Sequence, residues 1–138
     1  MLRQLYIENI AVIEKTSLEL VKGFNLLTGE TGAGKSIIID SIHAILGERT
    51  SRELIRTGCD QALVSAVFAD VGPWAAAKLE ELGYGLEEDG TLLLQRVLRA
   101  DGKGSCRVGG RPATVSILRE LGRLLVDVHG QHDNQALL

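Results

Sequence analysis

Residues 29–36 read Gly-Glu-Thr-Gly-Ala-Gly-Lys-Ser and fit the pattern G-x-x-x-x-G-K-[ST], the phosphate-binding loop (P-loop) of nucleoside triphosphatases. Gly29 and Gly34 allow backbone dihedrals that a Cβ would forbid, so that successive N–H groups can turn inward toward an anion. Lys35 brings a cation to the β- and γ-phosphates, and Ser36 offers a hydroxyl to Mg²⁺. The residues of this segment expected to bind the nucleotide are Gly29, Glu30, Thr31, Gly32, Ala33, Gly34, Lys35, Ser36 and Ile37.

The neighbouring residues supply the strand and the helix that a P-loop needs on its two sides. Residues 24–28 predict a buried strand, and residues 36–46 predict a helix whose apolar side chains share one face at helical spacing. Gly47 is placed to end that helix. A glycine-rich turn beside a surface lysine is the alternative interpretation, but the agreement of strand, loop and helix favours a nucleotide site.

Composition is that of an ordinary soluble domain. The chain has 138 residues, 45% of them hydrophobic and 24% charged, which is enough for one domain with a core. Its net charge of −3 argues against a wholly basic nucleic-acid binder, and an aromatic content of 4% leaves no evident platform for stacking bases. Cys59 and Cys106 lie far apart and predict free thiols in a reducing compartment. No apolar run approaches the roughly 20 residues that span a bilayer.

Alternating apolar residues predict the strands. They are expected over residues 2–8 and 16–21, and the short turn between these two favours an antiparallel start to the sheet. Further strands are expected over residues 63–69, 91–98 and 105–109, the last two forming a hairpin.

Two further helices are expected. One runs over residues 72–82, because Pro73 suits a first helical turn, and the other runs over residues 114–121, because Thr114 can cap it. Residues 48–61 are rich in charge and predict an exposed connection with a turn of helix.

Several segments together resemble one protein family. Residues 27–42, which contain the P-loop, resemble the RecN family of bacterial DNA-repair proteins, in the SMC-like branch of ABC-type ATPases. The resemblance extends to residues 2–9 (Leu-Arg-Gln-Leu-Tyr-Ile-Glu-Asn), 54–58 (Leu-Ile-Arg-Thr-Gly) and 128–132 (Val-His-Gly-Gln-His), and it covers essentially all 138 residues. Many ATPases share the P-loop, whereas its combination with the His-Gly-Gln-His segment is much more specific.

The resemblance implies an α/β P-loop NTPase fold: the N-terminal lobe of an ABC/SMC-type head, with a mixed sheet that has an antiparallel β portion and flanking helices. Residues 1–138 would form a single domain. In that family a long coiled coil interrupts the head, and the signature motif and the Walker B acid–base pair lie beyond it. Nothing in this sequence matches Leu-Ser-Gly-Gly, and the chain ends in mid-pattern. We therefore expect a fragment of a longer ATPase that is incomplete for hydrolysis by itself.

The resemblance also implies cofactors and partners. ATP and Mg²⁺ are the expected cofactors. The expected partners are the C-terminal lobe of the same protein, a second head in a homodimer, and DNA ends. ATP hydrolysis would then drive repair of double-strand breaks in the bacterial cytoplasm, at the nucleoid and without a membrane partner. Because the sequence shows no base-reading helix or basic stripe, the DNA partner rests on resemblance alone.

The resemblance assigns roles to two residues outside the P-loop. Gln131 would be the Q-loop glutamine, whose neutral amide reaches Mg²⁺ or the attacking water, so that Lys35 and Gln131 are the expected catalytic residues and Ser36 and Gln131 hold the metal. The alternative is an ordinary loop glutamine, and the strand expected before Gln131 favours the Q-loop. Asn9 is expected near the nucleotide base, with a simple turn asparagine as the alternative.

Arg49, Arg52 and Arg56 lie in the charged connection after the P-loop helix. One of them could contact nucleotide or DNA. A solvated, charged connection is the commoner explanation for such a segment.

Two patterns near the end of the chain resemble a Walker B strand and a zinc site. Residues 124–128 predict a short apolar strand that could be taken for a Walker B strand, with Asp127 on Mg²⁺. Arg123 interrupts the usual apolar run, however, and no glutamate follows Asp127. The loop after this strand could suggest a zinc site, but two histidines three residues apart without a firm third ligand are weak support. The residues concerned are His129, His132 and Asp133.

Two other functions are compatible with the P-loop. The first is a fragment of a P-loop helicase acting on RNA or DNA, whose loop differs little from this one, although the sequence contains no D-E-x-H box. The second is a module that binds ATP as a signal without hydrolysing it. The sequence that follows residue 138 distinguishes these possibilities, because long heptads and a later signature motif would support the head.

Overall fold

The computed structural model describes residues 1–20 and 32–126. Within these ranges six strands form one sheet in the order β2-β1-β3-β4-β5-β6, and each neighbouring pair is antiparallel. The strands are β1 (Leu2–Ile10), β2 (Ile13–Glu19), β3 (Gln61–Phe68), β4 (Leu92–Arg99), β5 (Ser105–Val108) and β6 (Arg111–Ala113). The helices are α1 (Gly32–Ile45), the short 3-10 helix η1 (Arg52–Leu54), α2 (Gly72–Leu82) and α3 (Val115–Val126).

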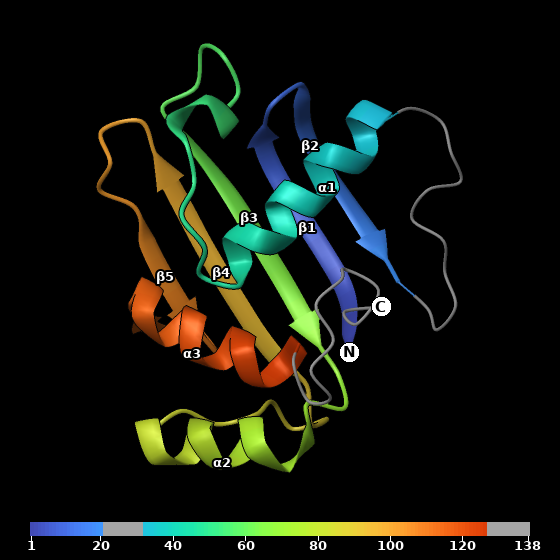
Figure 1. Ribbon diagram of the computed structural model, residues 1–138, viewed down its shortest axis with the longest axis vertical. Coiled ribbons are helices and arrows are strands. Elements are labelled where there is room, and N and C mark those ends of the chain that lie inside the picture. The colour runs from blue at the N-terminus through green and yellow to red at the C-terminus, as the bar shows by residue number, and fades with distance from the viewer. Residues whose placement is uncertain (21–31, 127–138) are drawn as a thin grey trace.

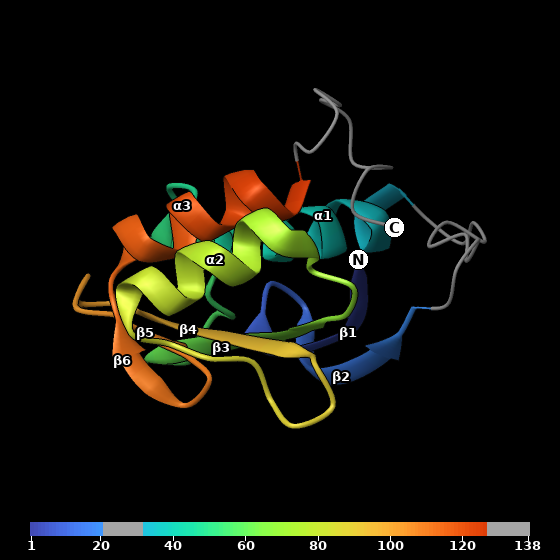
Figure 2. The same ribbon diagram turned by 90° about the horizontal axis from the view of Figure 1, so that it is seen from below.

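The three α-helices lie on one side of the sheet. Helix α1 crosses β1, β3 and β4, α3 lies beside it over β5, and α2 packs against α3 (Figures 1 and 2). Alternation in the strands explains this arrangement, since every second residue of β3 and β4 is buried toward the helices. The structure thus confirms the α/β class, the antiparallel portion of the sheet and the flanking helices. The strand expected over residues 24–28 lies outside the described residues.

Local signals predicted most element ends. Gly47 and Gly83 follow α1 and α2 with left-handed φ angles of 86° and 87°, as helix-ending glycines do. The side chain of Thr114 accepts a hydrogen bond from the Ile117 N–H at 3.2 Å and caps α3. Helix α1 begins four residues earlier than expected, so its first turns include the end of the P-loop sequence.

The strand predicted over residues 124–128 is wrong over residues 124–126, because these residues continue α3. Leu118, Leu121 and Leu125 are buried at helical spacing, and this packing against the core decides the conformation. A short apolar run does not distinguish a strand from a buried helix segment. The Walker B interpretation requires a strand over these residues and is therefore not supported. The Q-loop assignment of Gln131 used the same expected strand and loses that support. Asp127 lies outside the described residues.

Strand β6 was missed by the sequence reasoning. Its three residues pair with β5 across a two-residue turn, with Val108 opposite Arg111. Gly109 and Gly110 form that turn with φ angles of 59° and 84°, the left-handed pair that a tight hairpin requires. The Gly-Gly pair was therefore a hairpin signal.

Candidate nucleotide-binding site

The end of the P-loop sequence forms the N-terminal turns of α1. Gly34, Lys35 and Ser36 are exposed there, and Ile37 is half-buried against the core. A helix N-terminus carries the positive end of the helix dipole, and the first turn of α1 contains no acidic side chain. The lysine and the hydroxyl thus stand at a position that favours an anion. Gly29, Glu30 and Thr31 lie outside the described residues.

Helix α1 is fixed to the sheet along its length. Ile42 and Ile45 are buried in the core, and the hydroxyl of Ser41 donates a hydrogen bond to the Ile37 carbonyl at 2.9 Å. At the far end, the Arg96 guanidinium Nη1 donates to the carbonyl oxygens of Ala44 and Glu48, both at 2.8 Å. A cation on the last carbonyls complements the dipole of the helix. Because α1 is anchored in this way, its N-terminus is held in a defined place above the sheet.

Asn9 lies at the end of β1 in a left-handed conformation with a φ of 57°. Asparagine tolerates this region better than most residues. Its carbonyl accepts a hydrogen bond from the Arg56 N–H at 2.8 Å, and the Ala11 N–H donates to the Leu54 carbonyl at 2.7 Å. The turn between β1 and β2 is thereby attached to the connection after α1. A turn role for Asn9 is visible, while its contact with a nucleotide base stays a prediction.

A cleft of about 420 Å³ opens between these elements. Ile37 and Asp40 of α1 form one wall, Ala11 of the β1–β2 turn another, and Arg49 and Ser51 of the connection a third. The fold therefore brings one predicted nucleotide-binding residue, the turn just after Asn9 and Ile10, and one of the three candidate arginines around a single hollow. Arg56 points elsewhere: its Nη1 donates to the Val12 carbonyl at 3.4 Å.

Gln131 and the residues of the possible zinc site lie outside the described residues, so their roles stay predictions. Within residues 1–20 and 32–126, no three His, Cys, Asp or Glu side chains gather in a metal-binding group. None of the helices described in these ranges has the length and hydropathy needed to cross a bilayer.

Sequence reasoning missed three arginines that the fold brings beside the charged connection: Arg96, Arg99 and Arg119. Arg96 carried a usable signal. It occupies an inward position of β4 between the buried Leu94 and Leu98, where alternation calls for an apolar side chain. A charged side chain is rarely buried at such a position unless it has a bonding partner.

Known proteins are similar to this chain in sequence and in fold. Residues 4–71 match the protein family described as an AAA domain. The chain is 46% identical over 139 aligned residues to the DNA repair protein RecN of Halalkalibacterium halodurans, and 42% identical over 139 residues to that of Bacillus subtilis. Each alignment covers 100% of the chain and 24% of the relative, so the chain spans about a quarter of the length of these relatives.

A solved structure described as "Structural biochemistry of ATP-driven dimerization and DNA stimulated activation of SMC ATPases" has a similar fold. It superimposes with a TM-score of 0.68 at 24% identity, over 90% of this chain and 78% of that chain. The relatives confirm the resemblance seen in the P-loop and the His-Gly-Gln-His segment. The structural neighbour confirms the SMC-head type of fold.

Proposed function

We infer that this chain is the N-terminal lobe of a RecN-type ATPase head, which binds ATP with Mg²⁺ and serves ATP-driven DNA repair. The observation that carries this proposal is the P-loop sequence at the N-terminal end of α1, a helix anchored on an antiparallel sheet of the SMC-head type. Similarity to RecN proteins over the whole length of this chain supports the same assignment.

The residues of this chain would bind and orient the nucleotide. Residues 29–34 would surround the phosphates with backbone N–H groups, and Lys35 would neutralise charge on the β- and γ-phosphates. Ser36 and Gln131 would hold Mg²⁺, which would offset negative charge on the phosphates. The cleft between Ile37, Ala11 and Arg49 offers space beside this position for the rest of the nucleotide.

Hydrolysis would require parts that this chain does not contain. Phosphoryl transfer depends on positioning and on electrostatic stabilisation around an in-line water. The signature motif and the general base would come from the C-terminal lobe and from a second head, with ATP between the two heads. Their engagement and release would control contact with DNA ends. The RecN relatives favour this account over a helicase fragment, and turnover by the whole protein distinguishes it from a nucleotide-sensing module.

Nucleotide binding provides the direct test. In the full-length protein that contains this chain, Lys35→Ala should weaken binding of a fluorescent Mg-ATP analogue at least tenfold, because a charge-assisted phosphate contact is lost. Lys15→Ala is the matched control, since Lys15 is an exposed lysine on β2 that does not line the cleft proposed for the nucleotide. Equal affinity of the Lys35 variant and the unaltered protein would refute the P-loop assignment.

A further inference from the structure

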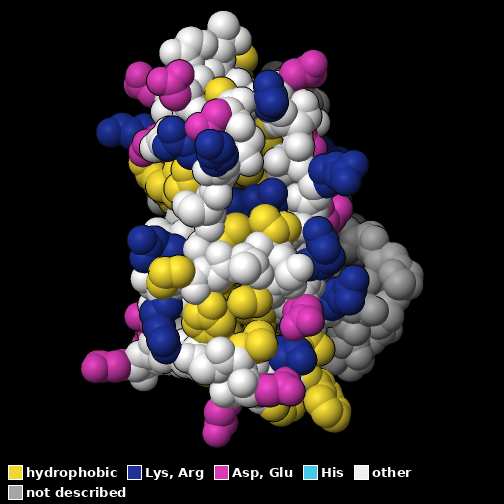
Figure 3. Space-filling view, turned by 90° about the vertical axis from the view of Figure 1, so that its left-hand side faces the viewer, with side chains coloured by type: hydrophobic (Ala, Val, Ile, Leu, Met, Phe, Trp, Pro, Cys, Tyr) yellow, Lys and Arg dark blue, Asp and Glu magenta, His cyan; other side chains and the backbone are white. Residues whose placement is uncertain are grey.

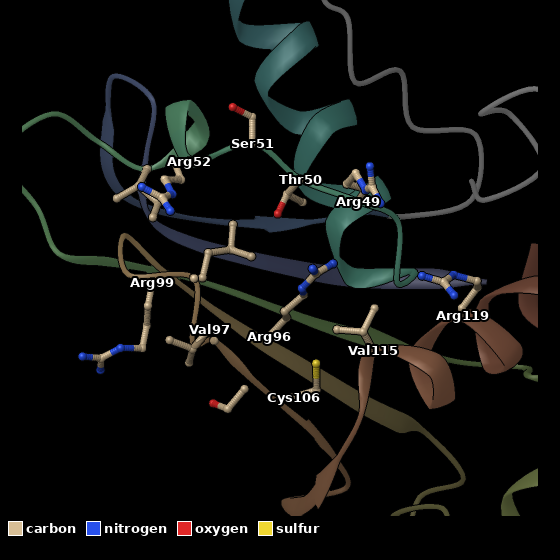
Figure 4. A pocket seen from close by; sticks show the side chains of 15 residues that line it. Arg49, Thr50, Ser51, Arg52, Arg96, Val97, Arg99, Cys106, Val115 and Arg119 are labelled. Carbon is tan, nitrogen blue, oxygen red and sulfur yellow. The ribbon is translucent and has the colours of Figure 1, made fainter.

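A second cavity, of about 360 Å³, lies between the connection after α1, the β4–β5 hairpin and the first turn of α3. Five arginines line it, and we call it the arginine pocket: Arg49, Arg52, Arg96, Arg99 and Arg119. They come from three separate parts of the chain. Figure 4 shows Arg96 rising from β4 in the middle, Arg119 reaching in from α3, and Arg49 and Arg52 on the connection.

The charge of the pocket is strongly one-sided. Its fifteen lining residues include five arginines and no aspartate or glutamate. Just outside the lining, Asp101 lies 3.4 Å from Arg99, and Glu48 and Glu53 flank the pocket residues of the connection. On the same side of the molecule, Lys and Arg side chains gather around a hollow (Figure 3). Such a concentration of positive charge is notable in a chain whose net charge is −3.

Arg96 forms the floor of the pocket and is nine-tenths buried. Its two hydrogen bonds go to neutral carbonyl oxygens, those of Ala44 and Glu48, so among the described residues no carboxylate neutralises it. Burial lowers the pKa of Arg96 and the like charge of Arg119 lowers it further, against an opposing effect of Cys106. A bound anion would relieve the cost of keeping this charge out of water.

The rim supplies donors that are ready for a ligand. Arg49, Arg52 and Arg119 are exposed, and within residues 1–20 and 32–126 their side chains make no hydrogen bond or ion pair. Val115, the first residue of α3, also lines the pocket, which places the positive end of that helix dipole at its edge. Guanidinium groups match phosphate oxygens with paired hydrogen bonds.

The arginine pocket adjoins the cleft proposed for the nucleotide, since Arg49, Thr50 and Ser51 line both hollows, but its floor lies away from the P-loop sequence. Arg96 binds the C-terminal end of α1, whereas the P-loop sequence lies at its N-terminal end. The 14 residues of α1 separate the two ends by about 20 Å. A triphosphate held by Lys35 and Ser36 therefore lies at the opposite end of α1 from Arg96, and a different phosphate is needed to contact Arg96.

We propose that the arginine pocket binds a backbone phosphate of DNA. The proposal rests on the proposed function, which supplies DNA as the anionic partner, and it assigns a contact point to that partner. No aromatic side chain lines the pocket, so the contact would position the DNA backbone and would not read its sequence. Arg96 would fix the phosphate from below, while Arg119 and Arg52 would close over it from the rim.

The test compares DNA binding by the full-length protein and by two variants, Arg119→Glu and Arg52→Glu/Arg119→Glu. Affinity for a fluorescently labelled duplex is measured by anisotropy over a series of salt concentrations. Arg119→Glu should weaken binding about tenfold and lower the slope of log K against log [salt] by about one, and the double variant should lower the slope by about two. Arg107→Glu is the matched control, because Arg107 is an exposed arginine on β5 outside the pocket with the same change in charge.

Each outcome decides the proposal. Loss of DNA affinity in Arg119→Glu, with the Arg107 control and Mg-ATP binding unchanged, supports it. Equal losses in the Arg119 and Arg107 variants, or unchanged DNA binding in the double variant, would overturn the pocket and leave the proposed function standing. Weakened Mg-ATP binding in Arg119→Glu without any loss of DNA affinity would assign the pocket to free nucleotide instead. If the unaltered protein bound no DNA in any nucleotide state, both the pocket and the DNA-repair function would fall. Circular dichroism confirms that each variant is folded.

Discussion

At the scale of single residues, Arg96 has two roles: it binds the end of α1 and it lines the arginine pocket. It occupies an inward position on β4, yet its Nη1 donates to the Ala44 carbonyl in the last turn of α1 and to the Glu48 carbonyl just after that helix, both at 2.8 Å. The same guanidinium forms the floor of the arginine pocket. One side chain thus fastens the helix that carries the P-loop sequence and offers a positive charge to a ligand.

Asp89 gives a prediction about pH at the same scale. Its Oδ1 accepts hydrogen bonds from the Thr91 hydroxyl at 2.6 Å and from the Thr91 N–H at 3.0 Å, just before β4. These bonds lower the pKa of Asp89 below 3.8, the hydroxyl contributing most. Because the folded-state pKa is depressed, the stabilisation is present above pH 3.8 and disappears as pH falls through the folded value.

Asp89→Asn keeps an oxygen acceptor at every pH but removes the charge. Urea denaturation should therefore show the unaltered protein more stable than Asp89→Asn at pH 7, with the difference shrinking below pH 4. A difference that stays constant from pH 7 down to pH 3 would show that ionisation of Asp89 contributes nothing to folding.

At the scale of elements, α1 connects the predicted triphosphate site to the arginine pocket, and its C-terminal end is tightly packed. Gly47 follows α1 with a φ of 86°, and a Cβ built there would lie 2.5 Å from the backbone nitrogen of Arg119 in α3. Only glycine allows both this conformation and this close approach. The end of α1 is consequently locked against α3 as well as against β4.

Gly47→Ala should destabilise the protein by about 3 kcal/mol, the sum of a left-handed backbone and a forced displacement of α3. Gly58→Ala is the matched control: its φ is 89°, but a Cβ there meets nothing within 4 Å. It should cost about 1 kcal/mol from backbone strain alone. Chemical denaturation measures both free energies of unfolding. Equal losses of stability in the two variants would show that the close approach of α3 to Gly47 does not add to the cost of the substitution.

Sequence patterns predicted a helix or strand correctly where a single local pattern was clear. Alternation located β1, β3 and β4, and proline, threonine and glycine signals located the ends of the helices. The end of α3 was predicted as a strand because the run Leu124-Leu125-Val126 is short and apolar, and only its packing shows which period applies. The exposed N-terminal turns of α1 agree with the P-loop prediction, although most of that loop lies outside the described residues.

The arginine pocket could not be predicted in the same way. Its members sit in a charged connection, in β4 and in α3, and no single segment is a basic stripe. Only the antiparallel order of the sheet and the packing of α3 bring Arg52, Arg96 and Arg119 together. Sites of this kind depend on tertiary structure, which composition and local periodicity do not specify.

At the scale of the whole molecule, the chain spans about a quarter of the length of its RecN relatives, 24% in each alignment. The proposed head is accordingly composite: this lobe would bind ATP, and the remainder of the protein would complete the catalytic site. The proposed triphosphate contact lies at the N-terminal end of α1, and the proposed DNA contact lies beside its C-terminal end, where Arg96 binds the Ala44 carbonyl. Both proposed ligands would thus contact this lobe.

Mg-ATP binding and turnover by residues 1–138, measured beside the full-length protein and with Lys35→Ala in each, test the composite head most directly. We expect residues 1–138 to bind Mg-ATP through Lys35 without hydrolysing it, and the full-length protein to hydrolyse it. Lys35-dependent turnover by residues 1–138 alone would refute the composite head, because the general base and the Mg²⁺-binding acid would then have to lie within this chain.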